Sequence, residues 1–203
     1  MKITIIDYGM GNVKSIIGAL KYLKVEEIKV SNKSEDIYSS DKLILPGVGS
    51  FPVAMKNIRD LGLENHLKEA IQVKKIPVLG ICLGMQLLGN SSLEGGFSKG
   101  LSFVEGEVEK MSNSTFKVPH IGFNQVNSYG ESTLYKGLNN LSDFYFVHSF
   151  KMQSKNNICQ STCFYDGNFI ASFEVNNIFG VQFHPELSQK NGLTLLENFI
   201  NYN

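Results

Sequence analysis

The chain has 203 residues, 42% of them hydrophobic and 19% charged, which is the composition of a globular protein rather than a disordered one. Lysine plus arginine and aspartate plus glutamate each number 19, so the zero formal net charge gives no support for nucleic acid or a membrane surface as a partner. No secretory signal or membrane span is predicted, and three cysteines without framework spacing favour a reducing cytoplasm. We expect a single domain over residues 1–203.

The first half of the chain alternates short apolar runs with helical patterns. Strands are predicted at residues 3–6, 28–30, 43–45 and 77–81. Apolar residues recur at helical spacing over 16–23 and 63–71, and a further helix is predicted to start at 85–88. Strands that alternate with helices indicate βαβ units around a parallel sheet.

The second half of the chain has the pattern of antiparallel strands. They are predicted at 105–111, 125–126 and 143–150, with a further strand at 179–183. Asp166-Gly167 is a hairpin signal, Asn176-Asn177 resembles a second tight turn, and an amphipathic helix is predicted over 193–200. The fold class is therefore α/β, with a mostly parallel central sheet flanked by helices and a smaller antiparallel extension.

Cys82 is the first candidate for chemistry. It lies between a predicted strand and a predicted helix, with Gly80 two residues before it and Gly84 two residues after it. That spacing has the form of a nucleophile elbow, in which strand and helix pass so closely that a Cβ at either glycine would clash. The start of a helix also favours the negative charge of a thiolate. The alternative from these residues alone is that Cys82 packs in the core.

A cysteine nucleophile needs a general base, and the chain has four histidines that could serve. His66 lies in a charged helical pattern and is predicted to be a solvated surface residue. His184 begins His184-Pro185-Glu186 directly after a predicted strand, and if the segment stays extended Glu186 projects beside His184. The carboxylate can then orient the imidazole toward the thiol. The alternative is that Pro185 ends the strand and Glu186 faces solvent.

Donors for an oxyanion are predicted from two places. One is the backbone N–H of Leu83, the residue after the proposed nucleophile. The second is the loop Pro46-Gly47-Val48-Gly49, which leaves the C-terminal end of a predicted strand, where ligands of parallel sheets bind. The alternative for this loop is an ordinary tight turn.

Together these pieces resemble a known family. Gly80-Ile-Cys-Leu-Gly-Met-Gln86 with a distal His184-Pro-Glu186 resembles the class I, triad-type glutamine amidotransferases, which have a flavodoxin-like sheet. Further blocks are similar to those of the HisH-type glutaminase subunits of imidazole glycerol phosphate synthase. They are Asp7-Tyr-Gly-Met-Gly-Asn12, Pro46-Gly-Val-Gly49, Val118-Pro-His-Ile-Gly-Phe-Asn124, Phe146-Val-His-Ser149 and Gly180-Val-Gln-Phe-His-Pro-Glu186.

The resemblance implies that the chain is an enzyme that hydrolyses L-glutamine to glutamate and ammonia. Cys82 would attack the side-chain amide and form a thioester, His184 would protonate the ammonia and then activate water, and Glu186 would orient His184. The resemblance places the glutamine beside six residues: Gly47, Gly49, Leu83, Gln86, His148 and Ser149. It implies no metal and no organic cofactor.

The resemblance also implies a partner. Ammonia would pass to a (β/α)₈-barrel synthase subunit in a heterodimer, which makes imidazole glycerol phosphate and aminoimidazole carboxamide ribotide in histidine biosynthesis. Four residues are assigned to the interface with that subunit: Asn12, His120, Phe123 and Leu187. No nucleic acid or membrane partner is implied.

Two of the assigned interface residues depart from the family pattern. Phe123 stands where the family usually has tryptophan, and Leu187 stands where it usually has lysine. Phenylalanine keeps an aromatic anchor, whereas leucine cannot form an ion pair across the interface. One interpretation is drift at an interface that the partner repacks. The alternative is a paralogous glutaminase subunit that supplies ammonia to another synthase, for example one that amidates a sugar nucleotide in glycan biosynthesis.

Overall fold

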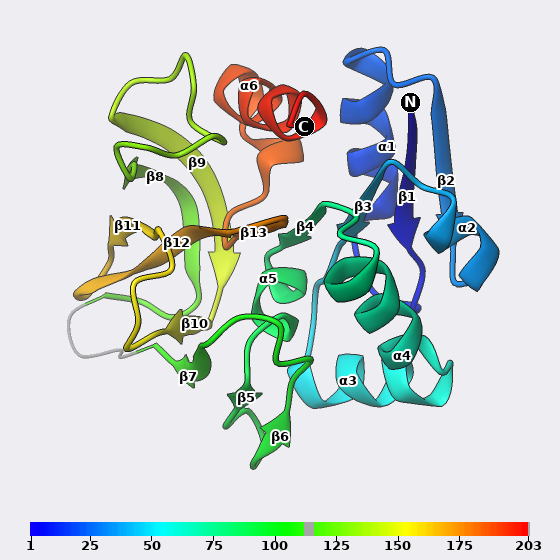
Figure 1. Ribbon diagram of the computed structural model, residues 1–203. Helices are drawn as coiled ribbons and strands as arrows, with labels where there is room; N and C mark the ends of the chain where they lie inside the picture. The colour runs from blue at the N-terminus through cyan, green and yellow to red at the C-terminus, as the bar shows by residue number, and fades with distance from the viewer. Residues whose placement is uncertain (112–115, 203) are drawn as a thin grey trace.

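The computed structural model describes residues 1–111 and 116–202, which form two sheets with helices around the larger one (Figure 1). The strands of the larger sheet are, in spatial order, β2 (Glu27–Ser31), β1 (Lys2–Ile6), β3 (Lys42–Leu45), β4 (Val78–Ile81), β13 (Ile178–Val181), β12 (Asn168–Val175), β11 (Ser161–Phe164), β8 (His120–Asn127) and β9 (Leu141–His148). The smaller sheet contains, in order, β10 (Phe150–Gln153), β7 (Glu107–Lys110), β5 (Ser91–Ser92) and β6 (Ser98–Lys99).

The larger sheet is parallel in one half and antiparallel in the other. Strands β2, β1, β3, β4 and β13 run parallel, and every pairing from β13 to β9 is antiparallel. In Figure 1 the parallel strands lie to the right and the antiparallel strands to the left, with β4 and β13 between them. The predicted α/β class is thus confirmed, although four of the nine strands of this sheet belong to its antiparallel half.

Six α-helices are found among the described residues: α1 (Val13–Tyr22), α2 (Ser34–Tyr38), α3 (Phe51–Asp60), α4 (Leu63–Lys68), α5 (Leu83–Leu87) and α6 (Gln189–Ile200). One turn of π-helix, Glu69–Val73, continues α4. The predicted helices correspond to α1, α4, α5 and α6, whereas α2 and α3 were not predicted. Both predicted tight turns are confirmed, because they join β11 to β12 and β12 to β13.

Hydrophobic cores cover both faces of the larger sheet. On one face, side chains of α2 to α5 pack against strand residues such as Ile6, Leu43 and Val78. On the other face, α1 and α6 pack against Ile3 and Ile5. Alternate residues of β1 therefore enter different cores, as the pleat of a strand requires. This two-sided burial holds the ends of the central strands in fixed positions.

Further observations concern cysteine and histidine side chains and the lengths of the helices. All three cysteines are unpaired, as expected from their number and spacing. His66, predicted to be a solvated surface residue, is only partly exposed, and its Nδ1 lies 2.8 Å from the hydroxyl oxygen of Tyr38. Within residues 1–111 and 116–202, no helix is long and apolar enough to cross a membrane.

Three neighbouring parallel strands end at the same edge of the sheet, and each leads directly into predicted site residues. Strand β3 leads into the loop 46–49, β4 into Cys82, and β13 into the segment 182–184. Because the strand order is β3-β4-β13, the three segments meet at one place. This is the edge at which ligands of open parallel sheets bind.

Candidate active site

Cys82 occupies a sharp turn between β4 and α5. Its φ is +54° and its ψ is −110°, a conformation that residues with a Cβ rarely adopt. A Cβ on Gly84 would lie 1.8 Å from the carbonyl oxygen of Leu45, and one on Gly80 would lie 2.8 Å from the carbonyl carbon of Gly84. The predicted clash at both glycines is confirmed. Cys82 is therefore on a strained strand–turn–helix elbow.

His184 and Glu186 form a buried pair. The Nδ1 atom of His184 lies 2.8 Å from Oε1 of Glu186, and the two side chains are only 4% and 1% exposed. The predicted extended geometry is wrong, because Pro185–Leu187 forms a turn of 3₁₀ helix. Proline at the first helical position favours such a turn because its φ is already fixed near −65°. The carboxylate reaches the ring from the turn rather than from a continued strand.

The backbone on both sides of His184 is anchored. Its N–H donates to the carbonyl of Tyr145 in β9, and its carbonyl accepts from the hydroxyl of Ser188 at 2.6 Å. Its Nε2 atom is buried and makes no hydrogen bond of ordinary geometry with the described residues. A carboxylate on Nδ1 fixes that nitrogen as the donor and leaves Nε2 as the nitrogen that can take a proton.

The electrostatics of His184 favour its protonated form. Burial by itself lowers the pKa of His184, but its interactions with Cys82 and with Glu186 outweigh burial and raise that pKa to about 10. A protonated imidazole between a sulfur atom and a carboxylate is the arrangement of a thiolate–imidazolium pair with an orienting acid. The three groups can perform nucleophilic acyl chemistry.

A cleft of about 220 Å³ opens beside the sulfur of Cys82. Five of the six residues predicted to contact substrate line it: Gly49, Leu83, Gln86, His148 and Ser149. Gly47, the sixth, lies immediately outside and contacts Leu83 through its carbonyl. Sequence reasoning missed Glu94, which also lines the cleft and whose Oε2 accepts a hydrogen bond from the N–H of Phe51 at 2.8 Å.

The oxyanion donor predicted at Leu83 is already occupied. Its N–H points at the carbonyl oxygen of Gly47, 3.3 Å away, which is long for such a bond. A second hydrogen bond stabilises the loop that carries Gly47, because the buried hydroxyl of Tyr8 donates to the carbonyl of Pro46 at 2.5 Å. In this conformation the Gly47 carbonyl occupies the N–H that was predicted to bind an oxyanion.

A directional network of hydrogen bonds runs beneath the cleft, and its polarity follows from the carbonyl of Phe150. A carbonyl only accepts, so the Nδ1 of His148, 2.8 Å from it, carries the proton and the Nε2 of His148 is an acceptor. The Nδ1 of His120, 3.0 Å from that Nε2, must then be the donor. Burial lowers the pKa of His120 to about 4 and that of His148 to about 3, which keeps both rings neutral.

Two of the four residues predicted at a partner interface lie on opposite faces of β8, and the other two lie elsewhere. Phe123 is 50% exposed and packs edge-on against Tyr145, whereas His120 is buried on the opposite face of the strand. Leu187 is exposed next to the His184 turn, and Asn12 is exposed, with its Nδ2 donating to the hydroxyl of Ser15. Three of the four are therefore available at the surface.

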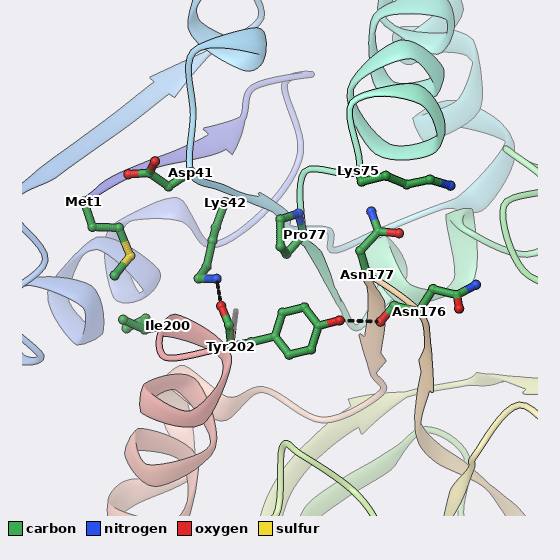
Figure 2. Close-up of a pocket in the computed structure, with 9 residues that line it drawn as sticks. All are labelled: Met1, Asp41, Lys42, Lys75, Pro77, Asn176, Asn177, Ile200 and Tyr202. Atoms are coloured by element: carbon green, nitrogen blue, oxygen red, sulfur yellow. Dashed lines mark hydrogen bonds between the residues drawn. The ribbon is translucent and has the colours of Figure 1, made fainter.

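A larger cavity, of about 780 Å³, lies away from this chemistry, beside the first residues of β1, β3 and β4 (Figure 2). Figure 2 shows the ammonium of the buried Lys42 pointing at the carbonyl of Tyr202, to which it donates. The same ammonium lies 5.7 Å from the ring centre of Phe199. We infer that Lys42, through these contacts, links the C-terminal end of α6 to the sheet and has a structural role.

Two comparisons with other sequences identify the family. Residues 4–202 match the family model described as glutamine amidotransferase class-I. The chain is 47% identical to an imidazole glycerol phosphate synthase subunit HisH 1 of Campylobacter jejuni, over 97% of this chain and 98% of that one. It is 45% identical to a HisH 2 subunit of Vibrio vulnificus, over 100% of this chain and 95% of that one.

Solved structures show the same fold. PurLQS from Thermotoga maritima superposes with a TM-score of 0.71 at 18% identity, over 99% of this chain and 98% of that chain. The glutaminase domain of Trypanosoma brucei CTPS, with bound acivicin, gives a TM-score of 0.69 at 16% identity, over 100% and 95%. The fold, the match over nearly the whole length and the sequence identity lead to one conclusion: this chain belongs to the class-I glutamine amidotransferase family.

Proposed function

We propose that this chain is the glutaminase subunit of an imidazole glycerol phosphate synthase and acts in histidine biosynthesis, with residues 1–203 as one catalytic domain. The names and coverage of its relatives support the assignment. The observation that carries the chemistry is the buried His184–Glu186 pair beside Cys82 on a strained elbow. Unpaired cysteines support a cytoplasmic location.

The proposed reaction has two steps. The Cys82 sulfur attacks the side-chain carbonyl carbon of glutamine, and His184 gives its proton to the departing nitrogen, which leaves as ammonia. A water molecule then attacks the thioester while His184 takes its proton, and the C–S bond breaks to release glutamate. Glu186 stabilises the imidazolium form of His184 through the 2.8 Å contact with Nδ1.

The cleft offers two groups that suit the α-amino end of glutamine. Both hydrogens of the Gln86 amide are used inside the protein, because its Nε2 donates to the Phe150 carbonyl and to Gln182. Gln86 therefore presents its oxygen as an acceptor. With the carboxylate of Glu94 it would attract the positively charged α-amino group of the substrate.

We further propose that the loop 46–49 switches the glutaminase on. Turning the Gly47–Val48 peptide would remove the Gly47 carbonyl from Leu83 and direct a second N–H toward the cleft. Gly47 and Gly49 allow this, because glycine tolerates backbone conformations that other residues do not. The isolated chain should be nearly inactive, and full glutaminase activity without any synthase would contradict this switch.

The partner subunit is proposed to dock next to Cys82. The outward face of β8 and β9 carries Ile121, Phe123 and Val147, which are 59%, 50% and 38% exposed and lie side by side in register. Leu187 adds a further exposed apolar side chain. An apolar patch of this kind typically marks a protein interface. The carbonyl of Val147 is 4.0 Å from the Cys82 sulfur, so this surface lies next to the proposed nucleophile.

The deciding experiment separates glutamine-dependent from ammonia-dependent turnover in the reconstituted complex. Cys82→Ala should abolish glutamate release while the synthase still turns over with added ammonium. Cys159→Ser is the matched control, since Cys159 lies outside the cleft and should leave both activities intact. Glutamine-dependent turnover that survives in Cys82→Ala would refute the assignment of the nucleophile.

The second candidate function is supply of ammonia to a different synthase, and one observation supports it. Leu187 is an exposed apolar side chain at the position where the family usually has lysine. The relatives do not favour this alternative, because their names specify imidazole glycerol phosphate synthase.

A further inference from the structure

A buried amide with no role in the reaction described above lies beside the nucleophile. Strand β13 pairs with β4 so that Val181 faces Ile81, and the next residues, Gln182 and Cys82, are therefore neighbours at the ends of the two strands. Gln182 is 0% exposed. Its Nε2 lies 3.6 Å from the sulfur of Cys82, within range for an N–H donor to sulfur.

The orientation of this amide is fixed by its surroundings. The carbonyl of Phe150 can only accept, so the Gln86 nitrogen, 3.0 Å away, must face it. The same nitrogen is 2.9 Å from the Gln182 side chain, which must therefore present its oxygen to Gln86. The other end of Gln182, the NH₂ group, is left facing Cys82.

We propose that Gln182 is a catalytic residue that donates a hydrogen bond to the Cys82 sulfur, with Gln86 as the positioning residue that holds it in this orientation. The proposal rests on Cys82 acting as the nucleophile. Before attack, the hydrogen bond stabilises the thiolate. When the thioester breaks, the electron pair of the C–S bond returns to sulfur, and the same N–H stabilises the departing thiolate.

The test measures the sulfur directly, by the rate at which iodoacetamide alkylates Cys82 in the isolated chain, followed by mass spectrometry of the Cys82 peptide. Gln182→Met keeps a similar volume but removes the donor. Because a hydrogen bond to a charged group contributes about 1.5–3 kcal/mol, alkylation near neutral pH should slow by roughly tenfold or more. The profile of alkylation rate against pH should also move to higher pH.

Two further variants exclude a merely structural role. Gln182→Glu is isosteric and keeps an oxygen toward Gln86, but it places a carboxylate against the sulfur, so alkylation should slow at least as much. Gln86→Met removes the group that orients Gln182, so it should slow alkylation as well as raise the KM for glutamine. Each variant is accepted only if its urea unfolding remains cooperative, and Gln86→Met serves if a Gln182 variant does not fold.

The proposal is overturned if folded Gln182→Met and Gln182→Glu, or Gln86→Met in their place, react with iodoacetamide at the wild-type rate across the pH range. This outcome is distinguishable from failure of the proposed function. Alkylation requires neither glutamine nor a synthase, whereas the nucleophile assignment is judged by glutamate release from Cys82→Ala.

Discussion

Gly84→Ala tests whether the elbow is held by close contact between backbones. The new Cβ would lie 1.8 Å from the oxygen and 2.8 Å from the carbon of the Leu45 carbonyl, so α5 must move away from β3 by roughly 1 Å or more. Overpacking that side chains can absorb costs about 1–3 kcal/mol. Here both neighbours are backbone atoms in a buried strand, so we expect a loss of about 3 kcal/mol or more.

The assay is urea unfolding combined with a thermal scan. For a chain of this size 1 kcal/mol corresponds to about 2–4 °C, so the midpoint temperature should fall by roughly 6–12 °C. Gly18→Ala is the matched control, because Gly18 lies in α1 with nothing within 4 Å of its added Cβ. That change should stabilise the chain by about 0.5–1 kcal/mol. A Gly84→Ala protein as stable as the wild type would refute the argument from backbone contact.

Three further predictions concern the base, the loop and the interface. The folded-state pKa of His184, about 10, lies above its usual 6.5, so the stability it contributes is complete below pH 6.5 and is lost as pH rises toward 10. In urea titrations, the free energy of unfolding of Glu186→Gln should therefore fall furthest below that of the wild type at pH 6 and least near pH 10. A difference between the two proteins that grows with pH would contradict this. Tyr8→Phe removes the hydrogen bond to Pro46, which should lower the free energy of unfolding, measured in urea, by about 1 kcal/mol. Because the loop is then less restrained, the isolated chain should release glutamate faster. An unchanged release rate would argue against restraint of the loop by Tyr8. Leu187→Lys should improve activation by a histidine-pathway synthase, and no change or a loss would favour another acceptor.

The sequence predicted the positions of the proposed catalytic residues better than the structure around them. Cys82, His184 and Glu186 could be selected as candidates because each lies within a few residues of a predicted strand end. The course of the chain through Pro185 was predicted incorrectly, since a fixed φ near −65° is compatible with an extended chain and with a 3₁₀ turn. Burial of the Glu186 carboxylate against His184 distinguishes the two, and burial is a property of the whole fold.

Other differences between expectation and structure came from strand register and from long-range packing. His120 and Phe123 were both assigned to the interface, but no strand was predicted there; once both lie in β8, residues an odd number apart face opposite sides, and His120 is buried. Gln182 was predictable from the pairing of two strand ends once their neighbourhood was known. Glu94 reaches the cleft from the segment after β5, and nothing in the local sequence indicates that approach.

At Cys82 the residue that best suits the backbone conformation is not the residue that the proposed reaction requires, because its φ is positive. A residue with a Cβ held in such a backbone conformation costs of order 1–3 kcal/mol, a strain that glycine would relieve. Glycine, however, has no sulfur. Directed evolution of this chain for heat resistance alone should therefore favour glycine at position 82, which removes the proposed nucleophile, so a screen must score glutamate release together with thermal survival.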